Sequence, residues 1–121
     1  MLFHQEDNRT FALGGNHMIG LATPSRGAQT TELWRGRMDA GAATPLHQHD
    51  HEEVVLFLSG SGRATVGTQE VRYRAGDTVI LPPNTLHQIF ADTDTDLVAA
   101  MALATPITTP DGAVLDLPWR R

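Results

Sequence analysis

Apolar residues in this chain recur at every second position or in short unbroken runs, and no stretch of ten or more residues has a helical period. Turn residues separate these runs, as at Pro24-Ser25-Arg26-Gly27 and Gly60-Ser61-Gly62. We therefore expect an all-β protein built from short strands. The expected strands cover residues 18–22, 30–38, 54–58, 63–66, 70–74, 78–81, 86–90, 97–103 and 113–117.

Two of the expected strands are apolar on both faces. Residues 54–58 form an unbroken apolar run, and residues 97–103 contain only Leu, Val, Ala and Met. One face of each strand can line the interior. The other face is also apolar, so it must be covered by another part of the protein or by a partner. The cover is either the N-terminal segment or the tail of the same chain, or a second copy of it, and we expect a homodimer because exposed apolar patches are costly.

The length and composition indicate one compact domain over residues 1–121, with residues 1–17 as an N-terminal arm. Hydrophobic residues make up 40% of the 121 residues, which is ordinary for a globular protein. The formal net charge is −5, so the positive surface that non-specific nucleic-acid binding needs is missing, and an anionic membrane is an unfavourable partner for the same reason.

Two absences limit the chemistry. The chain has no cysteine, which excludes disulfides and thiolate ligands, and all nine basic residues are arginine, which excludes a lysine Schiff base. The first residues lack the basic and apolar regions of a signal peptide, and no run reaches the length of a membrane span. From these features we expect a cytoplasmic protein.

Histidines are concentrated in one short segment. Three of the six lie within residues 46–53, and in an extended chain His47 and His49 share a face that Glu53 can join after a further even step. His87 follows a turn-like segment far along the chain. Two imidazoles and a carboxylate suit Fe, Mn, Ni, Zn, Co or Cu, whereas the alternative is a solvated histidine-rich loop.

The spacing of the residues around these histidines distinguishes a metal site from a solvated loop. From Gly41 to Gly60 the chain fits G-x5-H-x-H-x3-E-x6-G, and from Gly76 it runs G-x5-P-x-N-x2-H. These two segments, residues 41–60 and 76–91, resemble the signature motifs of the cupin superfamily. The resemblance implies a jelly-roll barrel (a double-stranded β-helix) with the two motifs on neighbouring strands. It also implies one divalent transition metal ion bound by His47, His49, Glu53 and His87.

Some positions depart from the cupin pattern or lie outside it. Asn84 replaces the usual glycine, but asparagine also tolerates a left-handed backbone, and Ala91 replaces an asparagine that is not a ligand. His51 falls outside the implied ligand set, which requires a local bend, and Glu52 should then point outward. We expect His4 and His17 on the surface, and Arg35 and Arg37 facing solvent.

Three nitrogens and one carboxylate leave two positions of a six-coordinate ion open. We therefore expect a small metal-dependent enzyme of the dioxygenase or isomerase type that acts on a small organic molecule. The alternative is a non-enzymatic cupin that binds or senses a small ligand or the metal. No residue is singled out as catalytic, and Tyr73, Gln69 and Gln88 are the candidates for contacting substrate.

Overall fold

The computed structural model describes residues 1–121, and its regular secondary structure is almost entirely short strands. The only helices are single 3₁₀ turns at Gln5–Asp7 (η1), Pro24–Arg26 (η2) and Pro118–Arg120 (η3). The strands are β1 (Phe11–Leu13), β2 (Asn16–Ala22), β3 (Thr31–Met38), β4 (Gln48–His49), β5 (Glu53–Ser59), β6 (Ser61–Val66), β7 (Gln69–Arg74), β8 (Thr78–Leu81), β9 (His87–Ala91), β10 (Thr95–Ala102) and β11 (Ile107–Thr108).

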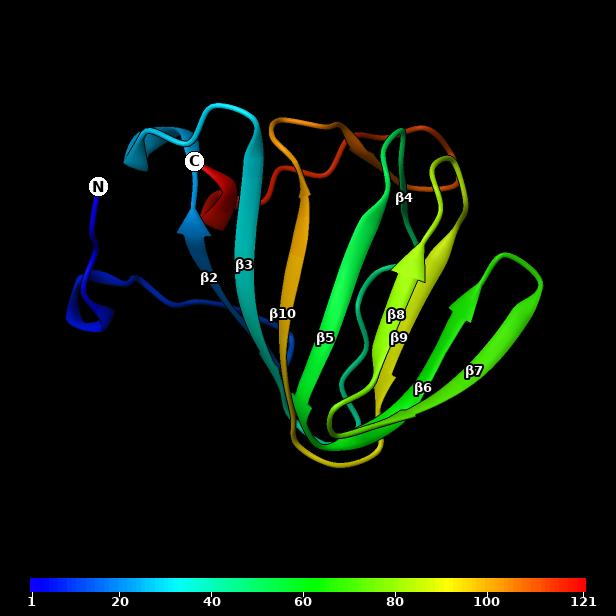
Figure 1. Ribbon diagram of the computed structural model, residues 1–121. Helices are drawn as coiled ribbons and strands as arrows, with labels where there is room; N and C mark the ends of the chain where they lie inside the picture. The colour runs from blue at the N-terminus through cyan, green and yellow to red at the C-terminus, as the bar shows by residue number, and fades with distance from the viewer.

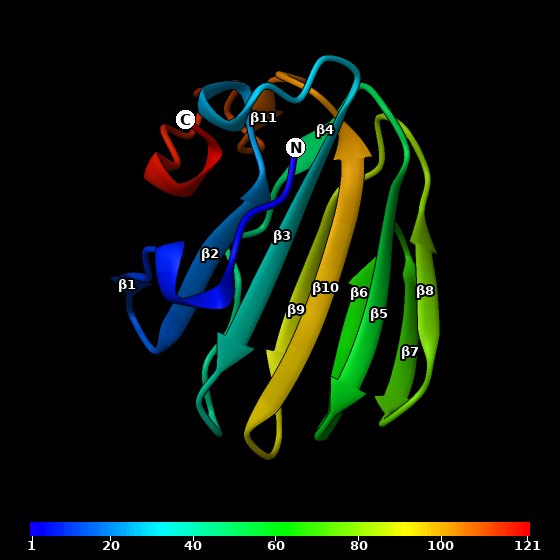
Figure 2. The ribbon, with the colours of Figure 1, turned by 60° about the vertical axis from the view of Figure 1, so that its left-hand side comes forward.

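Two antiparallel sheets face each other. The larger has the order β1-β2-β3-β10-β5-β8, and the smaller has the order β7-β6-β9 (Figure 1, Figure 2). The segment from Gly41 to His47 runs along the free edge of β9 and makes backbone hydrogen bonds with it, and β4 continues this edge to pair with β11. The expected all-β jelly-roll barrel is confirmed.

The core lies between the inner faces of the sheets. Strand β10 shows the reason, because Thr95, Leu97, Ala99 and Met101 are buried while the alternate residues are half-buried on the outer face. At one end of the barrel the rings of Phe57 and Tyr73 stack with centroids 3.7 Å apart. The opposite end contains the histidines of the first motif, so the apolar packing and the polar cluster occupy different ends of one interior.

Eight of the nine expected strands form, with ends that differ by a few residues. The expected strand at 113–117 is wrong, because only one isolated bridge forms there, between Thr108 and Val114. Its possible partner, β11, is two residues long and lies between Pro106 and Pro110, so little backbone is free for a ladder. Strands β1, β4 and β11 were not expected from the sequence, because two or three residues carry no detectable period.

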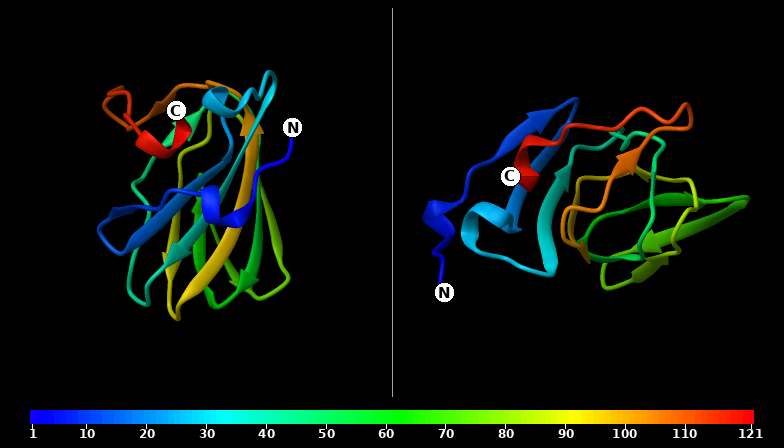
Figure 3. Two further views of the ribbon diagram at one scale, coloured as in Figure 1. Left: turned by 90° about the vertical axis from the view of Figure 1, so that its left-hand side faces the viewer. Right: turned by 90° about the horizontal axis from the view of Figure 1, so that it is seen from above.

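The C-terminal segment crosses one end of the barrel. After β10 the chain runs across this end and returns, and η3 finally lies beside β2 (Figure 3). Residues 1–10 of the N-terminal arm lie on the other side of the large sheet, against its outer face, whereas the rest of the arm enters this sheet as β1 and the start of β2. None of the helices has the length and apolar character needed to cross a lipid bilayer.

Candidate metal centre

Three separate parts of the backbone position the four residues that the motifs single out. His47 and His87 lie directly opposite each other in an antiparallel bridge, with N–O distances of 3.1 and 2.8 Å. His49 is in β4, and Glu53 begins β5 on the facing sheet. The two sheets therefore bring histidines from one side and a carboxylate from the other to the same point in the interior.

The ligating atoms are close enough to share one ion. One nitrogen or oxygen from each of the four residues lies within 4.8 Å of all the others. Between Nε2 atoms, His47 and His87 are 3.1 Å apart, and Oε2 of Glu53 lies 3.1 Å from Nε2 of His49 and 3.4 Å from Nε2 of His87. An ion about 2.1 Å from donors at right angles separates neighbouring donors by about 3.0 Å, so these spacings fit a transition metal ion.

Backbone carbonyls orient two of the imidazoles. Nδ1 of His47 lies 2.6 Å from the carbonyl oxygen of Pro45, and Nδ1 of His87 lies 3.0 Å from that of Thr85. A carbonyl only accepts, so in each neutral ring Nδ1 carries the proton and Nε2 is left with its lone pair. Both lone pairs then face the cluster, which is the arrangement that a metal-binding histidine needs.

Burial keeps the imidazole rings of His47 and His49 neutral. His49 and His87 are 3% and 2% exposed, and Glu53 is 6% exposed. Burial, reinforced by the neighbouring charge of His87, lowers the pKa of His47 to about 4, and the same two causes lower the pKa of His49 to about 4. The rings of His47 and His49 are therefore deprotonated at neutral pH and can act as ligands.

Buried atoms without hydrogen-bond partners show whether the cluster fits a metal ion. Oε2 of Glu53 and both ring nitrogens of His49 are buried and have no hydrogen-bond partner. Such atoms are rare in folded proteins because an unpaired buried polar group is costly. A cation in contact with Nε2 of His49 and Oε2 of Glu53 would satisfy both, so the donor set fits a divalent metal ion.

A cavity borders the cluster, and we call it the inner cavity. His47, Glu53 and His87 form one part of its wall, and twelve of its eighteen lining residues are hydrophobic. Its volume is about 70 Å³, whereas one water molecule needs roughly 10–15 Å³. One side of the cluster thus faces a mainly apolar space with room for several water-sized groups.

The remaining sequence candidates lie away from this cavity. Nδ1 of His51 contacts Oδ1 of Asp50 and Oγ1 of Thr105, each at 2.8 Å, and the ring is exposed outside the cluster, as expected. Tyr73 is buried, and its hydroxyl donates to the carbonyl of Phe90. Gln88 donates to the carbonyl of Thr44, and Gln69 is exposed in the β6–β7 hairpin. None of the three substrate candidates lines the inner cavity.

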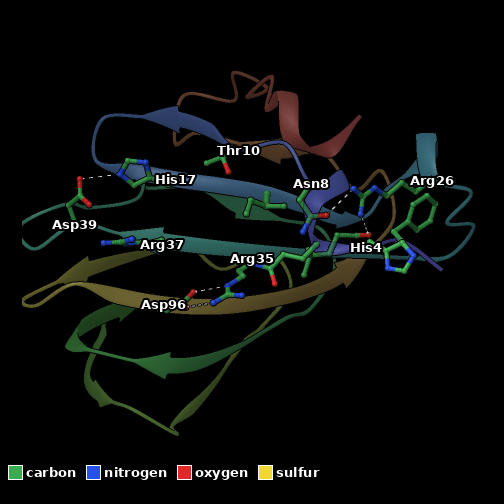
Figure 4. Close-up of a pocket in the computed structure, with 13 residues that line it drawn as sticks. His4, Asn8, Thr10, His17, Arg26, Arg35, Arg37, Asp39 and Asp96 are labelled. Carbon is green, nitrogen blue, oxygen red and sulfur yellow. Dashed lines mark hydrogen bonds and ion pairs between the residues drawn. The ribbon is translucent and has the colours of Figure 1, made fainter. Parts of the chain in front are cut away.

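A larger groove of about 990 Å³ lies on the outer face of the large sheet, under the N-terminal arm (Figure 4). Its charges are mostly paired with one another, since Arg35 binds Asp96 through two hydrogen bonds and His17 contacts Asp39 at 3.2 Å. Arg37 is exposed between these pairs, as expected for a solvent-facing residue. The groove contains no part of the four-residue cluster.

Sequence reasoning missed one buried charged pair near the centre. Glu32, on β3, is 1% exposed and accepts a 2.7 Å hydrogen bond from Nε of Arg120. The only available signal was the position of Glu32 in an otherwise inward-facing series with Trp34, Gly36 and Met38. Nothing in the sequence pointed to Arg120 as the partner, because it lies 88 residues away.

The fold and the cluster define a jelly-roll domain with a possible site for one metal ion. A family model described as "Cupin domain" matches residues 34–103, more than half of the chain. The chain belongs to this family.

The curated relatives include plant auxin-binding proteins. The chain is 27% identical over 86 residues to auxin-binding protein 5 of Zea mays, covering 64% of this chain and 57% of that protein. It is 26% identical over 102 residues to auxin-binding protein 1 of Arabidopsis thaliana, covering 77% and 52%. The chain thus spans about half the length of these relatives.

Solved structures share the fold at low identity. A cupin-2 domain protein of Rhodospirillum rubrum superposes with a TM-score of 0.79 and 20% identity, covering 91% of this chain and 80% of that one. An RmlC-like cupin of Shewanella frigidimarina gives a TM-score of 0.74 at 21% identity, covering 83% and 87%. Salicylate 1,2-dioxygenase of Pseudoaminobacter salicylatoxidans gives 0.66 at 21%, covering 72% and 26%.

Proposed function

We propose that this chain is a metal-dependent cupin in which His47, His49, Glu53 and His87 bind one divalent transition metal ion. The observation that carries the proposal is the buried cluster itself, with unpartnered ligating atoms beside a cavity. Three imidazoles and one carboxylate leave two positions of a six-coordinate ion free for a small organic molecule, water or dioxygen. The identity of the metal is open among Fe, Mn, Ni, Zn, Co and Cu, which all accept such ligands.

We further propose that the centre acts as an enzyme of the dioxygenase or isomerase type. When bound, the metal supplies Lewis acidity toward a carbonyl or enolate oxygen and, for redox-active ions, reactivity toward dioxygen. The chain contributes two oriented imidazoles, through the carbonyls of Pro45 and Thr85, and an apolar cavity that restricts water. The structural likeness to a salicylate 1,2-dioxygenase supports this direction but extends only to the fold.

A matched pair of histidine variants tests the proposal. The protein is loaded in turn with iron, manganese, nickel and copper, and oxygen uptake and product formation are followed with catechols, diketones and keto acids. Activity should disappear in His49→Ala and persist in His51→Ala, because His51 is exposed outside the cluster. An absence of turnover in every combination would contradict the enzymatic proposal.

The second candidate is a cupin that binds a small ligand without turning it over. The relatives named as auxin-binding proteins favour it, since their names describe binding and not catalysis. Tight binding of a small acid to the metal-loaded protein, with the acid recovered unchanged, would support this candidate over an enzyme.

We also propose a homodimer through the outer face of the large sheet. Cross-strand neighbours form an uncharged apolar row there, from Ile80 through Val54 and Ala100 to Leu33. Leu56 and Leu58 extend the row and are 39% and 45% exposed, and Ile80 is 59% exposed. Residues between Phe3 and Thr10 lie over the β2–β3 side of this face, so the second copy would pack on the side formed by β10, β5 and β8, where Ala100, Val54 and Ile80 lie.

Sedimentation velocity measures this association directly. Leu56→Asp should shift the protein from dimer to monomer, because the charge would be buried unpaired between two copies. Val114→Asp is the matched control, since Val114 is 68% exposed and distant from this face. A wild-type protein that sediments as a monomer at micromolar concentration would refute the dimer.

A further inference from the structure

The C-terminal segment, residues 115–121, forms one wall of the inner cavity. Leu115, Leu117 and Trp119 all line the cavity, at alternate positions of a segment that belongs to neither sheet. The backbone of this segment makes two hydrogen bonds to the rest of the protein: the amide of Leu115 donates to the carbonyl of Ile107 at 2.8 Å, and the carbonyl of Arg121 accepts from Oγ of Ser25 at 2.7 Å. The main chain alone therefore holds this wall weakly, and side chains must fix it.

The ion pair between Glu32 and Arg120 fastens the wall to the barrel. Nε of Arg120 donates to Oε1 of Glu32 at 2.7 Å, and Nη2 donates to the carbonyl of Thr105 at 2.7 Å. The other carboxylate oxygen of Glu32 accepts from the amide of Ala104 at 3.1 Å. Both oxygens of this buried carboxylate are thus paired, and its only cationic partner comes from the C-terminal segment.

The barrel is also shaped to receive Trp119. The Trp119 ring meets Trp34 edge to face, with centroids 5.8 Å apart and planes at 87°. A Cβ on Gly20, in β2, would lie 2.0 Å from the carbonyl oxygen of Trp119, so only glycine allows the backbones to approach this closely. Trp119 is 7% exposed as a result.

We propose that this segment determines which molecules enter the metal centre. The inference rests on the proposed function and names the ligand class: a small molecule with an apolar, aromatic or aliphatic body and one end bearing a carboxylate or enolate oxygen. The oxygen end faces His47, Glu53 and His87, where the cavity wall is polar. The body contacts the apolar wall, to which Leu117 and Trp119 contribute. A polyhydroxylated body should bind more weakly, because twelve of the eighteen lining residues are hydrophobic and most of its hydroxyls would find no partner there.

The two tryptophans of the chain, Trp34 and Trp119, both line the cavity, so intrinsic fluorescence reports its occupancy. The probes are benzoate, the larger 1-naphthoate, and gluconate as a polyhydroxylated acid. They are titrated against the full-length protein with and without cobalt(II), whose absorption spectrum separately reports metal binding. The wild type should bind benzoate, with much weaker binding of 1-naphthoate and gluconate.

Leu117→Ala enlarges the cavity without disturbing the ion pair. It should improve the binding of 1-naphthoate relative to benzoate by about tenfold or more, the effect of one or two methylene groups in a closed pocket. Val114→Ala is the control at an exposed position directly before the segment and should leave the ratio unchanged. Arg120→Gln should weaken benzoate binding and reduce its selectivity, whereas Arg121→Gln, which removes only an exposed pair with Asp116, should not.

The outcomes separate the two proposals. If cobalt binds, but Leu117→Ala and a folded Arg120→Gln variant bind 1-naphthoate and benzoate in the same ratio as the wild type, the proposed role of the wall is wrong. The proposed metal centre is then unaffected. If cobalt does not bind but Leu117→Ala still changes the ratio, the metal centre is wrong and the wall stands. Preference of the wild type for gluconate, or failure to bind any aromatic acid, would overturn the ligand class. Circular dichroism identifies variants that have lost the fold. If Arg120→Gln is one of them, the Leu117→Ala measurement still tests the role of the wall.

Discussion

Glu32 and Glu53 are two buried carboxylates in the same row of one sheet, yet their surroundings are opposite. Both lie beside Met101 of β10, Glu32 from β3 and Glu53 from β5, and they are 1% and 6% exposed. Both oxygens of Glu32 are hydrogen-bonded, to Arg120 and to the amide of Ala104. Oε2 of Glu53 faces imidazoles and has no hydrogen-bond partner.

The difference shows how a buried charge indicates its role. A carboxylate whose partners all belong to the protein is complete, and it holds parts of the chain together. A carboxylate left unpaired among neutral imidazoles lacks a positive charge that the chain does not supply, which is the condition that a bound cation meets. The following predictions separate the two carboxylates experimentally.

The largest effect should come from Glu53→Gln, which removes the anionic ligand. We expect metal affinity to fall by more than about 100-fold, because losing even an outer partner of a ligand costs 10–100-fold. Glu32→Gln should bind metal with the same stoichiometry, since Glu32 is outside the cluster. Competition with a chromophoric chelator measures both variants, and equal affinities in the two would contradict the separation of roles.

For the stability of the metal-free protein, the Glu32 variant should have the larger effect and the Glu53 variant the smaller. Glu32→Met leaves Arg120 without its carboxylate and should reduce the free energy of unfolding by about 3 kcal/mol, the lower end of the range for a broken buried pair, since the Arg120 side chain is 14% exposed. Glu53→Met should cost less than about 1 kcal/mol or be stabilising, because it removes an unpaired buried charge. Urea unfolding supplies both values. If Glu32→Met combined with Arg120→Met is no more stable than Glu32→Met alone, the two side chains are not coupled.

The metal-free protein should lose stability as the pH falls from about 6.5 to about 4. The pKa values of His47 and His49 are lowered by burial to about 4 in the folded state, whereas an unfolded histidine titrates near 6.5. In this interval the unfolded chain binds more protons, so the free energy of unfolding decreases with decreasing pH. Unfolding curves at a series of pH values test this, and His49→Gln should show a shallower dependence than His51→Gln.

The smallest effect should come from the exposed pair of Arg35 and Asp96 on the outer face. Asp96 raises the pKa of Arg35 through a hydrogen bond and through its charge, and the Arg35 side chain is 45% exposed. Arg35→Ala should therefore cost under about 1 kcal/mol, as exposed pairs do, although Arg35 and Asp96 share two hydrogen bonds and the buried pair of Arg120 and Glu32 shares only one. Urea unfolding in low and high salt measures it, and a cost equal to that of Glu32→Met would show that burial is not what separates the two pairs.

Local pattern predicted most of the strands and several individual residues. The alternation of Trp34, Gly36 and Met38 predicted one buried face, which β3 has. Asn84 was expected to adopt a left-handed backbone in place of glycine, and its φ is 55°. These features depend on near neighbours, so a short stretch of sequence carries the information. The strand expected at 113–117 was wrong because its hydrogen-bonding partner is set by the fold and not by its own residues.

The sequence by itself determined the cupin family, the all-β class and the four residues of the proposed centre, because the spacing within each motif is a property of the chain. The dimer and the cytoplasmic location stay predictions. Only the tertiary structure brought Glu32 and Arg120 together across 88 residues and placed Leu117 and Trp119 beside the cluster. Contacts between distant segments depend on how the sheets close around the interior, and neither partner of such a contact carries a local pattern that names the other.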